Sequence, residues 1–302
     1  DTFKCFPPGW IDFIDYRVRL VFQENLLATE LAQYEQPPGW VDIGPAWSTW
    51  GIGWGWPAFT LPFIEQNALY DQMGVSQQSL YNYLVAIISS GATSLEGTLL
   101  QTPLSVFNCP SDSGPEINNQ RSIAEGADGF YPAKSNYVGN NGVIGASRTF
   151  WFEGDGVFGP FTRFAIRDMV DGTSNTVAVS ERKYEQGYRA AAWFGVPLVP
   201  SAIWEHTTGG CSSILGNFAL PPNVLVDAAG VNVSFYAYFM LSSEHPGGGQ
   251  ALFCDGSIHF IPETIESTWS ALEPAVYLNK YAYGVWQRLA CRNDKLPVGE
   301  FQ

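Results

Sequence analysis

An Asp-Gly dipeptide near the C-terminus constrains the fold more than any other part of the sequence. Asp255 and Gly256 separate two short, largely apolar stretches, residues 250–254 and 257–261. Asp-Gly in this setting predicts a β-hairpin closed by a two-residue type I′ turn, because both turn residues tolerate positive φ. We therefore expect an antiparallel sheet built around a hairpin over residues 250–261.

A two-residue turn also determines which side chains share a face of the hairpin, since side chains alternate along each strand. We expect the buried face to carry Ala251, Phe253, Ile258 and Phe260. The opposite face is expected to carry Leu252, Cys254, Ser257 and His259.

A glycine-rich segment precedes the hairpin. Residues 246–249 read Pro-Gly-Gly-Gly, and glycine loses more backbone entropy on ordering than any other residue. We expect this segment to be a tight, irregular loop that positions His245 at the start of the first strand. Nine residues then separate His245 from Asp255-Gly256.

Five short blocks precede this pattern. In chain order they are Leu61-Pro62-Phe63-Ile64-Glu65-Gln66, Cys109-Pro110-Ser111-Asp112, Ser135-Asn136-Tyr137, Gly154-Asp155-Gly156 and Asp171-Gly172-Thr173-Ser174-Asn175-Thr176. Together with His-x9-Asp-Gly, their order resembles a large bacterial family of unknown function whose members begin with a prepilin-type leader. The C-terminal signature of that family is the prepilin-type processing-associated H-x9-DG domain.

The resemblance implies one pilin-like domain over residues 1–302, with an α+β fold in which helices pack on an antiparallel sheet. Residues 11–36 and 274–284 are expected to be insertions relative to the family, and residues 184–238 an irregular, β-rich surface region. In the family a long hydrophobic helix precedes the part equivalent to residues 1–10, so we expect this sequence to begin after it. The matching motif residues are Glu65, Cys109, Asp112, Asp171, Gly172, His245, Asp255 and Gly256.

The same resemblance implies a non-enzymatic, extracellular or cell-surface subunit that assembles with copies of itself into a pilus-like or tubular filament. Without the hydrophobic helix, the first ~20 residues would have another role: they would add a strand to a neighbour's sheet edge. Cell-surface components or glycans are further expected partners.

The composition limits the other partners of the chain. The net charge is −14 with only 15 Lys and Arg residues, which disfavours nucleic acids and anionic membranes. No run of about 18 apolar residues occurs, so no membrane span is expected. Charged residues make up 15% and aromatic residues another 15%, which predicts much apolar surface to bury, in the core or against other subunits.

Local patterns predict several further elements. Ser76 is expected to cap a helix over residues 76–90, because five apolar side chains follow a helical spacing: Leu80, Tyr83, Leu84, Ile87 and Ile88. Pro62 is expected to open a short helix packed through Phe63, Leu69 and Tyr70. The remaining expected elements are strands over residues 16–22 and 175–181 and helices over residues 23–34, 267–273 and 275–291.

A Gly/Trp-rich segment, residues 44–62, offers an alternative function. Exposed rings would stack on sugars, and the residues concerned are Trp47, Trp50, Trp54 and Trp56. The same rings would equally suit a position under a sheet or against another subunit. A secreted carbohydrate-binding or adhesion module therefore stands as the alternative to a filament subunit.

Catalytic and metal chemistry receive less support. Ser242, Ser243 and Glu244 adjoin His245, but triad partners converge from different elements, so we expect His245 to bond backbone groups of the glycine loop. A zinc set would pair Cys254 and His259 with His206 and Cys211, and calcium would use Asp155, Asp168 or Asp171. Neither set has the spacing of a known motif, so no metal or other cofactor is predicted. The chain has five cysteines, an odd number, and Cys254 is expected to be unpaired.

Overall fold

The computed structural model describes residues 5–12, 53–90, 93–122, 130–143, 155–159, 162, 164–185, 188–196, 210–269 and 282–298. A five-stranded sheet lies at the centre, in the order β10-β9-β5-β4-β8. Its strands are β4 (Tyr137–Asn140), β5 (Val177–Glu181), β8 (Leu215–Gly216), β9 (Gly248–Phe253) and β10 (Ile258–Pro262). All neighbours are antiparallel except β4 and β8, which are parallel.

Two smaller sheets accompany the central one. β1 (Trp10–Asp12), β2 (Gly53–Gly55) and β7 (Gly195–Val196) form the first, and β3 (Lys134–Ser135) pairs with β6 (Ala191–Ala192) in the second. The segment over residues 10–12 therefore pairs with a strand of its own chain. β2 pairs with one edge of this strand, and β1 is the outermost strand of the described sheet, so strand addition to a neighbour's sheet stays a prediction.

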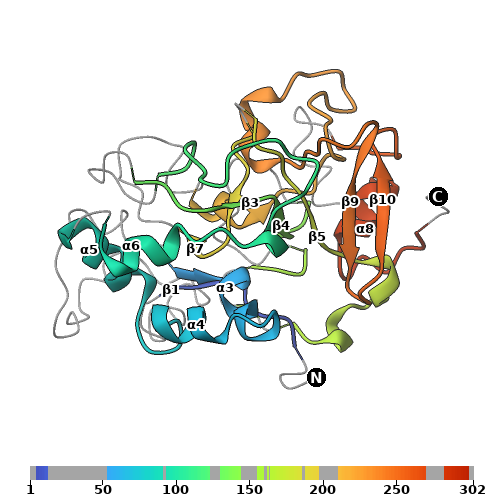
Figure 1. Ribbon diagram of the computed structural model, residues 1–302. Coiled ribbons are helices and arrows are strands. Elements are labelled where there is room, and N and C mark those ends of the chain that lie inside the picture. The colour runs from blue at the N-terminus through green and yellow to red at the C-terminus, as the bar shows by residue number, and fades with distance from the viewer. Residues whose placement is uncertain are drawn as a thin grey trace, which may run out of the picture.

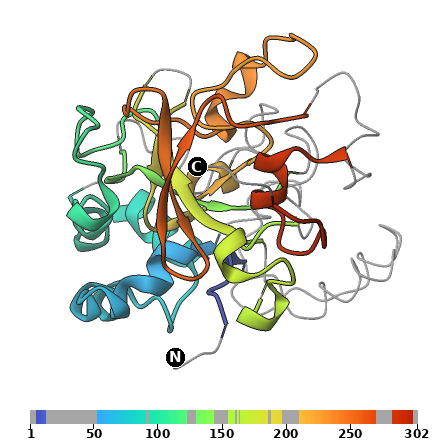
Figure 2. The ribbon, with the colours of Figure 1, turned by 90° about the vertical axis from the view of Figure 1, so that its right-hand side faces the viewer.

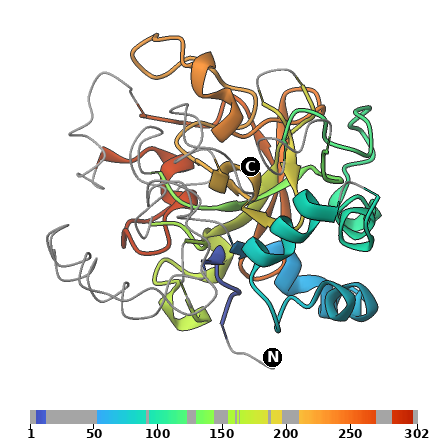
Figure 3. The ribbon, with the colours of Figure 1, turned by 90° about the vertical axis from the view of Figure 1, so that its left-hand side faces the viewer.

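The helices lie at two ends of the molecule. α3 (Trp56–Thr60), α4 (Asn67–Met73), α5 (Leu80–Ser90) and α6 (Leu95–Leu100) gather at one end, and α8 (Val285–Ala290) lies at the other beside the β9–β10 hairpin (Figures 1–3). Short 3-10 helices span Leu61–Phe63, Ser105–Phe107, Ile166–Asp168, Thr173–Asn175, Gly210–Ser213 and Ser234–Phe239. The mixture of helices and sheets confirms the expected α+β fold. Within the part described, no helix is long and apolar enough to cross a membrane.

Two apolar cores hold these elements together. One lies under the helices and includes Trp54, Trp193 and Phe194, and the other joins the sheet to α8 through the stacked rings of Phe218 and Trp286, 5.7 Å apart. The described parts of residues 184–238 contribute heavily to both cores. The expectation of a surface region there is wrong, because its aromatic and aliphatic side chains fill the interior.

The hairpin forms, but its register differs from the expected one. Phe253 N donates to Ser257 O at 2.9 Å and Gly256 N to Phe253 O at 3.0 Å, so residues 254–256 form a three-residue loop. Gly256 has a φ of 90° at the last loop position. Leu252 consequently lies opposite Ile258, one residue away from the expected pairing.

A one-residue shift moves every side chain of β10 to the other face. The buried side chains of the hairpin are Ala251, Phe253 and Ile261, and the ring of His259 packs edge-on against Phe253. Ile258 is 67% exposed and Phe260 43%, so both predictions of burial are wrong.

Matched substitutions on β10 test this register. Ile261→Val should lower the free energy of unfolding by about 1 kcal/mol, because a buried methylene is removed. Ile258→Val should change it by less than ~0.5 kcal/mol, because that side chain is exposed. Urea denaturation of both variants measures the difference. A larger loss of stability in Ile258→Val than in Ile261→Val would instead support the two-residue turn.

The glycines before the hairpin belong to a strand. Gly248 and Gly249 begin β9, contrary to the expected irregular loop. A Cβ at Gly248 would lie 2.0 Å from the carbonyl oxygen of Ile261, so the close approach of β10 requires glycine there. The backbone entropy that glycine loses on ordering is offset by the close packing of β9 against the β10 backbone.

The helix boundaries also differ in detail. α5 begins at Leu80, and Ser79 rather than Ser76 caps it by accepting a hydrogen bond from Asn82 N at 3.1 Å. The expected apolar face is buried except for Ile88, which is 40% exposed. Phe63 is 62% exposed rather than buried. Residues 177–181 form the expected strand, whereas residues 267–269 are not helical and α8 starts only after Gly284. The elements expected over residues 16–22 and 23–34 lie outside the described residues.

Candidate functional site

Three segments far apart in the sequence meet at one point. Cys109 follows the 3-10 helix Ser105–Phe107, Glu181 ends β5, and His245 precedes β9. His245 Nε2 lies 3.4 Å from Glu181 Oε1 and 3.7 Å from Cys109 Sγ. The three ligand-type atoms all lie within 4.8 Å of one another. We call these three residues the Cys-Glu-His cluster.

The carboxylate of Glu181 is held in one orientation. Its Oε2 atom accepts hydrogen bonds from Ser243 Oγ at 2.6 Å and from Gln250 N at 2.9 Å. Ser243 Oγ also accepts from His245 N at 3.1 Å. Ser243 therefore fixes both the Glu181 carboxylate and the backbone of His245. The Oε1 atom of Glu181 is left facing the His245 ring.

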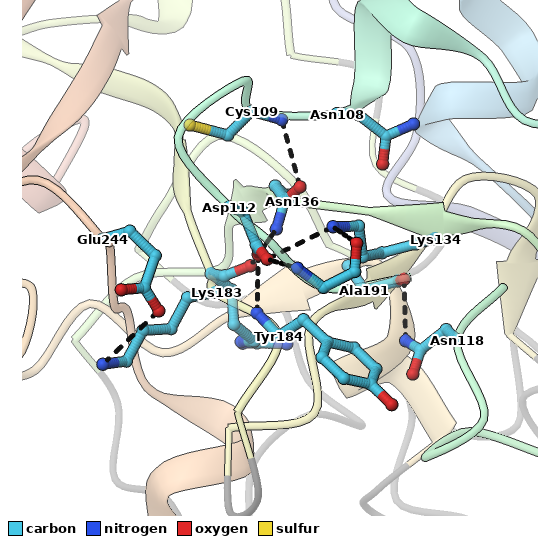
Figure 4. Close-up of polar contacts among 12 residues, drawn as sticks. Asn108, Cys109, Asp112, Asn118, Lys134, Asn136, Lys183, Tyr184, Ala191 and Glu244 are labelled. Atoms are coloured by element: carbon cyan, nitrogen blue, oxygen red, sulfur yellow. Dashed lines mark hydrogen bonds and ion pairs between the residues drawn. The ribbon is translucent and has the colours of Figure 1, made fainter. Parts of the chain in front are cut away.

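A buried polar network adjoins the cluster (Figure 4). Asn136 Oδ1 accepts a hydrogen bond from Cys109 N at 3.0 Å, and its amide donates to Asp112. Asp112 accepts further hydrogen bonds from Gly114 N and Tyr184 N, each at 2.7 Å, and pairs with Lys134 Nζ at 3.3 Å. The Cys-Pro-Ser-Asp and Ser-Asn-Tyr blocks thus form one structural unit that supports Cys109.

The pKa of Asp112 reflects this network. Burial raises the pKa of the carboxyl, but the hydrogen bonds from Gly114 and Tyr184, with Lys134 and Asn136, outweigh burial and leave it below the ordinary value. A carboxyl of this kind stabilises the fold fully above its unfolded-state pKa of about 4, and the stabilisation is lost as pH falls through the lower folded-state pKa.

Asp112→Asn should therefore flatten the acid limb of the stability profile. Below about pH 4 the slope of unfolding free energy against pH should fall by up to about 1.4 kcal/mol per pH unit, since one titrating group is removed. Urea denaturation at a series of acidic pH values measures the slope. Equal slopes for both proteins would contradict the role given to Asp112.

The cluster lacks the features of a nucleophilic site. Burial and the nearby Glu181 carboxylate raise the pKa of the Cys109 thiol, which disfavours the nucleophilic thiolate. Cys109 and Glu181 also approach the same nitrogen of His245, whereas a triad uses the two ring nitrogens for separate partners. The geometry suits Cys109 and Glu181 sharing one proton or one cation with His245 Nε2.

The other motif residues lie away from the cluster and support turns. Asp255 Oδ1 accepts from Ser257 N at 2.9 Å in the hairpin loop. Asp171 accepts from Asp294 N and Lys295 N, each at 2.7 Å, and so fastens the C-terminal segment. Gly172 has a φ of 95° and Glu65 a φ of 63°, both at turns.

Two of the four tryptophans assigned to sugar stacking are buried. Trp54 donates its indole N–H to Gln78 O at 2.9 Å, and Trp56 donates to Ile214 O at 2.8 Å. The stacking prediction is wrong for these two residues, because their rings form part of the core. Trp47 and Trp50 lie outside the described residues.

Within the described residues, the members of the metal sets suggested by spacing contact other groups. Cys254 lies in the hairpin loop with its sulfur 3.9 Å from Met169 Sδ, and His259 contacts Ser257 Oγ at 3.0 Å. His206 and the Cys211 side chain are not among the described groups. The expected aspartates also bond backbone N–H groups: Asp155 accepts from Val143 N and Asp168 from Ala165 N. The described cysteines, including Cys254, form no disulfide: Cys5, Cys109, Cys254 and Cys291.

Sequence reasoning missed Glu181 and Arg182 as site residues. Arg182 is fully buried, and its guanidinium donates to backbone carbonyls of Met240, Ser212, Leu215 and Phe239. The signal in the sequence was a charged pair directly after an apolar strand, where buried charge requires a specific partner.

Comparisons with known proteins give one match. The model of a family described as "Protein of unknown function (DUF1559)" matches residues 27–268. No curated protein and no solved structure matches the chain.

Proposed function

The chain belongs to the DUF1559 family of proteins of unknown function, and we propose that it is a non-enzymatic structural subunit of an extracellular, pilus-like or tubular polymer. The order of its sequence blocks, which resembles a prepilin-type family, supports an extracellular location. The observation that carries the proposal is the exposed apolar face of an edge strand.

That face belongs to the β9–β10 hairpin. β10 is the last strand on its side of the five-stranded sheet. Its outward side chains, Ile258 and Phe260, and the neighbouring Leu252 of β9 are exposed by 67%, 43% and 37%. Exposed edge strands that carry apolar residues favour association with another chain, and soluble proteins usually protect them with charge or proline. A second copy of this chain is the occupant we propose.

A further exposed apolar side chain, which we propose as the opposite contact, lies at the other end of the molecule. Leu95 on α6 is 63% exposed, and α6 lies far from the hairpin (Figure 1). Contact between two different surfaces is head-to-tail, and such contacts build open filaments when the rotation does not close a ring. The separation of the two sites therefore favours a polymer over a closed dimer.

The experiment compares assembly of three proteins. The unsubstituted chain should form polymers as its concentration rises, seen by sedimentation velocity and negative-stain electron microscopy. Ile258→Lys should raise the concentration needed by about tenfold or more, because an apolar contact is replaced by a desolvated charge. Val226→Lys, at another exposed aliphatic residue, is the control and should assemble normally.

Circular dichroism confirms that each variant is folded before assembly is compared. A monodisperse monomer of the unsubstituted chain at high concentration would overturn the proposal. Equal loss of assembly in Ile258→Lys and Val226→Lys would show that the hairpin is not the contact surface.

A further inference from the structure

We propose that the Cys-Glu-His cluster binds a single zinc ion, with Cys109 Sγ, Glu181 Oε1 and His245 Nε2 as its protein ligands. The site differs from the set that sequence spacing suggested. It unites three chain segments that lie 64 or more residues apart, at positions 109, 181 and 245.

The two distances from His245 Nε2 to the other ligand atoms are close to the edges of a zinc coordination tetrahedron, and all three atoms lie within 4.8 Å of one another. Zinc lies about 2.0–2.1 Å from nitrogen or oxygen and about 2.3 Å from sulfur, which places neighbouring ligand atoms roughly 3.3–3.6 Å apart. The observed separations are 3.4 Å between nitrogen and oxygen and 3.7 Å between nitrogen and sulfur. Small adjustments of side-chain torsions would bring both to the ideal values.

The direction of approach supports a shared cation. Cys109 and Glu181 converge on the same nitrogen of His245, so all three donor atoms face one point. Sulfur, imidazole nitrogen and carboxylate oxygen together form a mixed set that zinc accepts, whereas calcium and magnesium prefer oxygen alone.

The surrounding groups hold the ligands in place before any metal binds. Ser243 Oγ and Gln250 N bond the outer carboxylate oxygen of Glu181, which leaves Oε1 to face the cluster. Asn136 holds Cys109 through its backbone N–H. Such supporting hydrogen bonds orient metal ligands and change metal affinity by about 10–100-fold when removed.

The position of the site indicates what the zinc ion does. Cys109 and Glu181 are buried, whereas the His245 side chain is 29% exposed. We place a water molecule, as the fourth ligand, on this exposed side of the site. The ion would link the end of β5, where Glu181 lies, to the loop before β9 and to the loop after residue 107. It would thereby stabilise one end of the sheet.

Titration with Co(II), a spectroscopic substitute for zinc, tests the site directly. The unsubstituted protein should bind one equivalent, develop a sulfur-to-cobalt charge-transfer band, and release the cobalt when zinc is added. Zinc should also raise the thermal unfolding midpoint. Cys109→Ser should lose both the charge-transfer band and the zinc-dependent rise in the midpoint.

Two further variants separate metal binding from folding. Cys254→Ser alters a cysteine outside the cluster and should keep the band and the midpoint shift. Ser243→Ala keeps all three ligands and should weaken zinc binding by about 10–100-fold. Absence of the band in the unsubstituted protein, or its persistence in Cys109→Ser, would overturn the proposal.

Discussion

Arg182→Leu is expected to destabilise the protein by at least ~3 kcal/mol. The substitution leaves several buried carbonyl oxygens without their donor, and each unsatisfied group costs about 1–3 kcal/mol. The guanidinium now donates to Met240 O at 2.9 Å, Phe239 O at 2.8 Å and Leu215 O at 3.1 Å. These carbonyls belong to β8 and to residues 239–240, so the packing of both segments should loosen when the donor is lost.

Urea denaturation followed by tryptophan fluorescence measures the effect. Arg167→Leu is the matched control, since the Arg167 side chain is 88% exposed, and its effect should stay within ~0.5 kcal/mol. Arg182→Lys should recover little stability, because one ammonium group cannot reproduce the planar fork of donors. Similar stabilities of Arg182→Leu and Arg167→Leu would show that the buried hydrogen bonds of Arg182 make no net contribution to the free energy of unfolding.

Gly156→Ala should destabilise the fold by about 3 kcal/mol, the upper end of the range for overpacked sites. An added Cβ would lie 2.3 Å from Gly142 N and 2.5 Å from Asn140 O. Both are backbone atoms, so no side chain can rotate away. The end of β4 would have to separate from the segment over residues 155–159.

Gly230→Ala provides the comparison for this glycine. Gly230 has a φ of 80° in a turn, but no atom lies within 4 Å of an added Cβ. Its substitution should cost only about 1–2 kcal/mol, the strain of a left-handed backbone. A Gly156→Ala protein as stable as the Gly230→Ala protein would mean that the two backbone segments can move apart freely.

The sequence predicted the hairpin but not its register. Asp255-Gly256 signals a two-residue loop and a three-residue loop almost equally, since glycine suits the left-handed position of both. The choice depends on which face of β10 meets the core. Tertiary packing of Ile261 and His259 decides that question, and no local pattern contains it.

The residues of the site were recognised in part. His245 and Cys109 were identified as motif residues, yet their contact joins positions 136 residues apart. Only the strand order β9-β5-β4 brings them together. Glu181 and Arg182 form a charged pair at the end of an apolar strand, but neither their burial nor their partners follow from the local sequence. The inner position of residues 210–241 was also missed, since short two-residue strands have no periodicity to detect.

The place of β5 in the sheet has a consequence for how the protein reaches its native state. β5 receives one partner from residues 137–140 and the other from residues 248–253. During synthesis the pairing with residues 137–140 can form first, but the other must wait until residues 248–253 have left the ribosome. Pairings between distant segments also slow folding. The half-built sheet therefore persists, with one edge of β5 open, until residues 248–253 have been made and can pair with it.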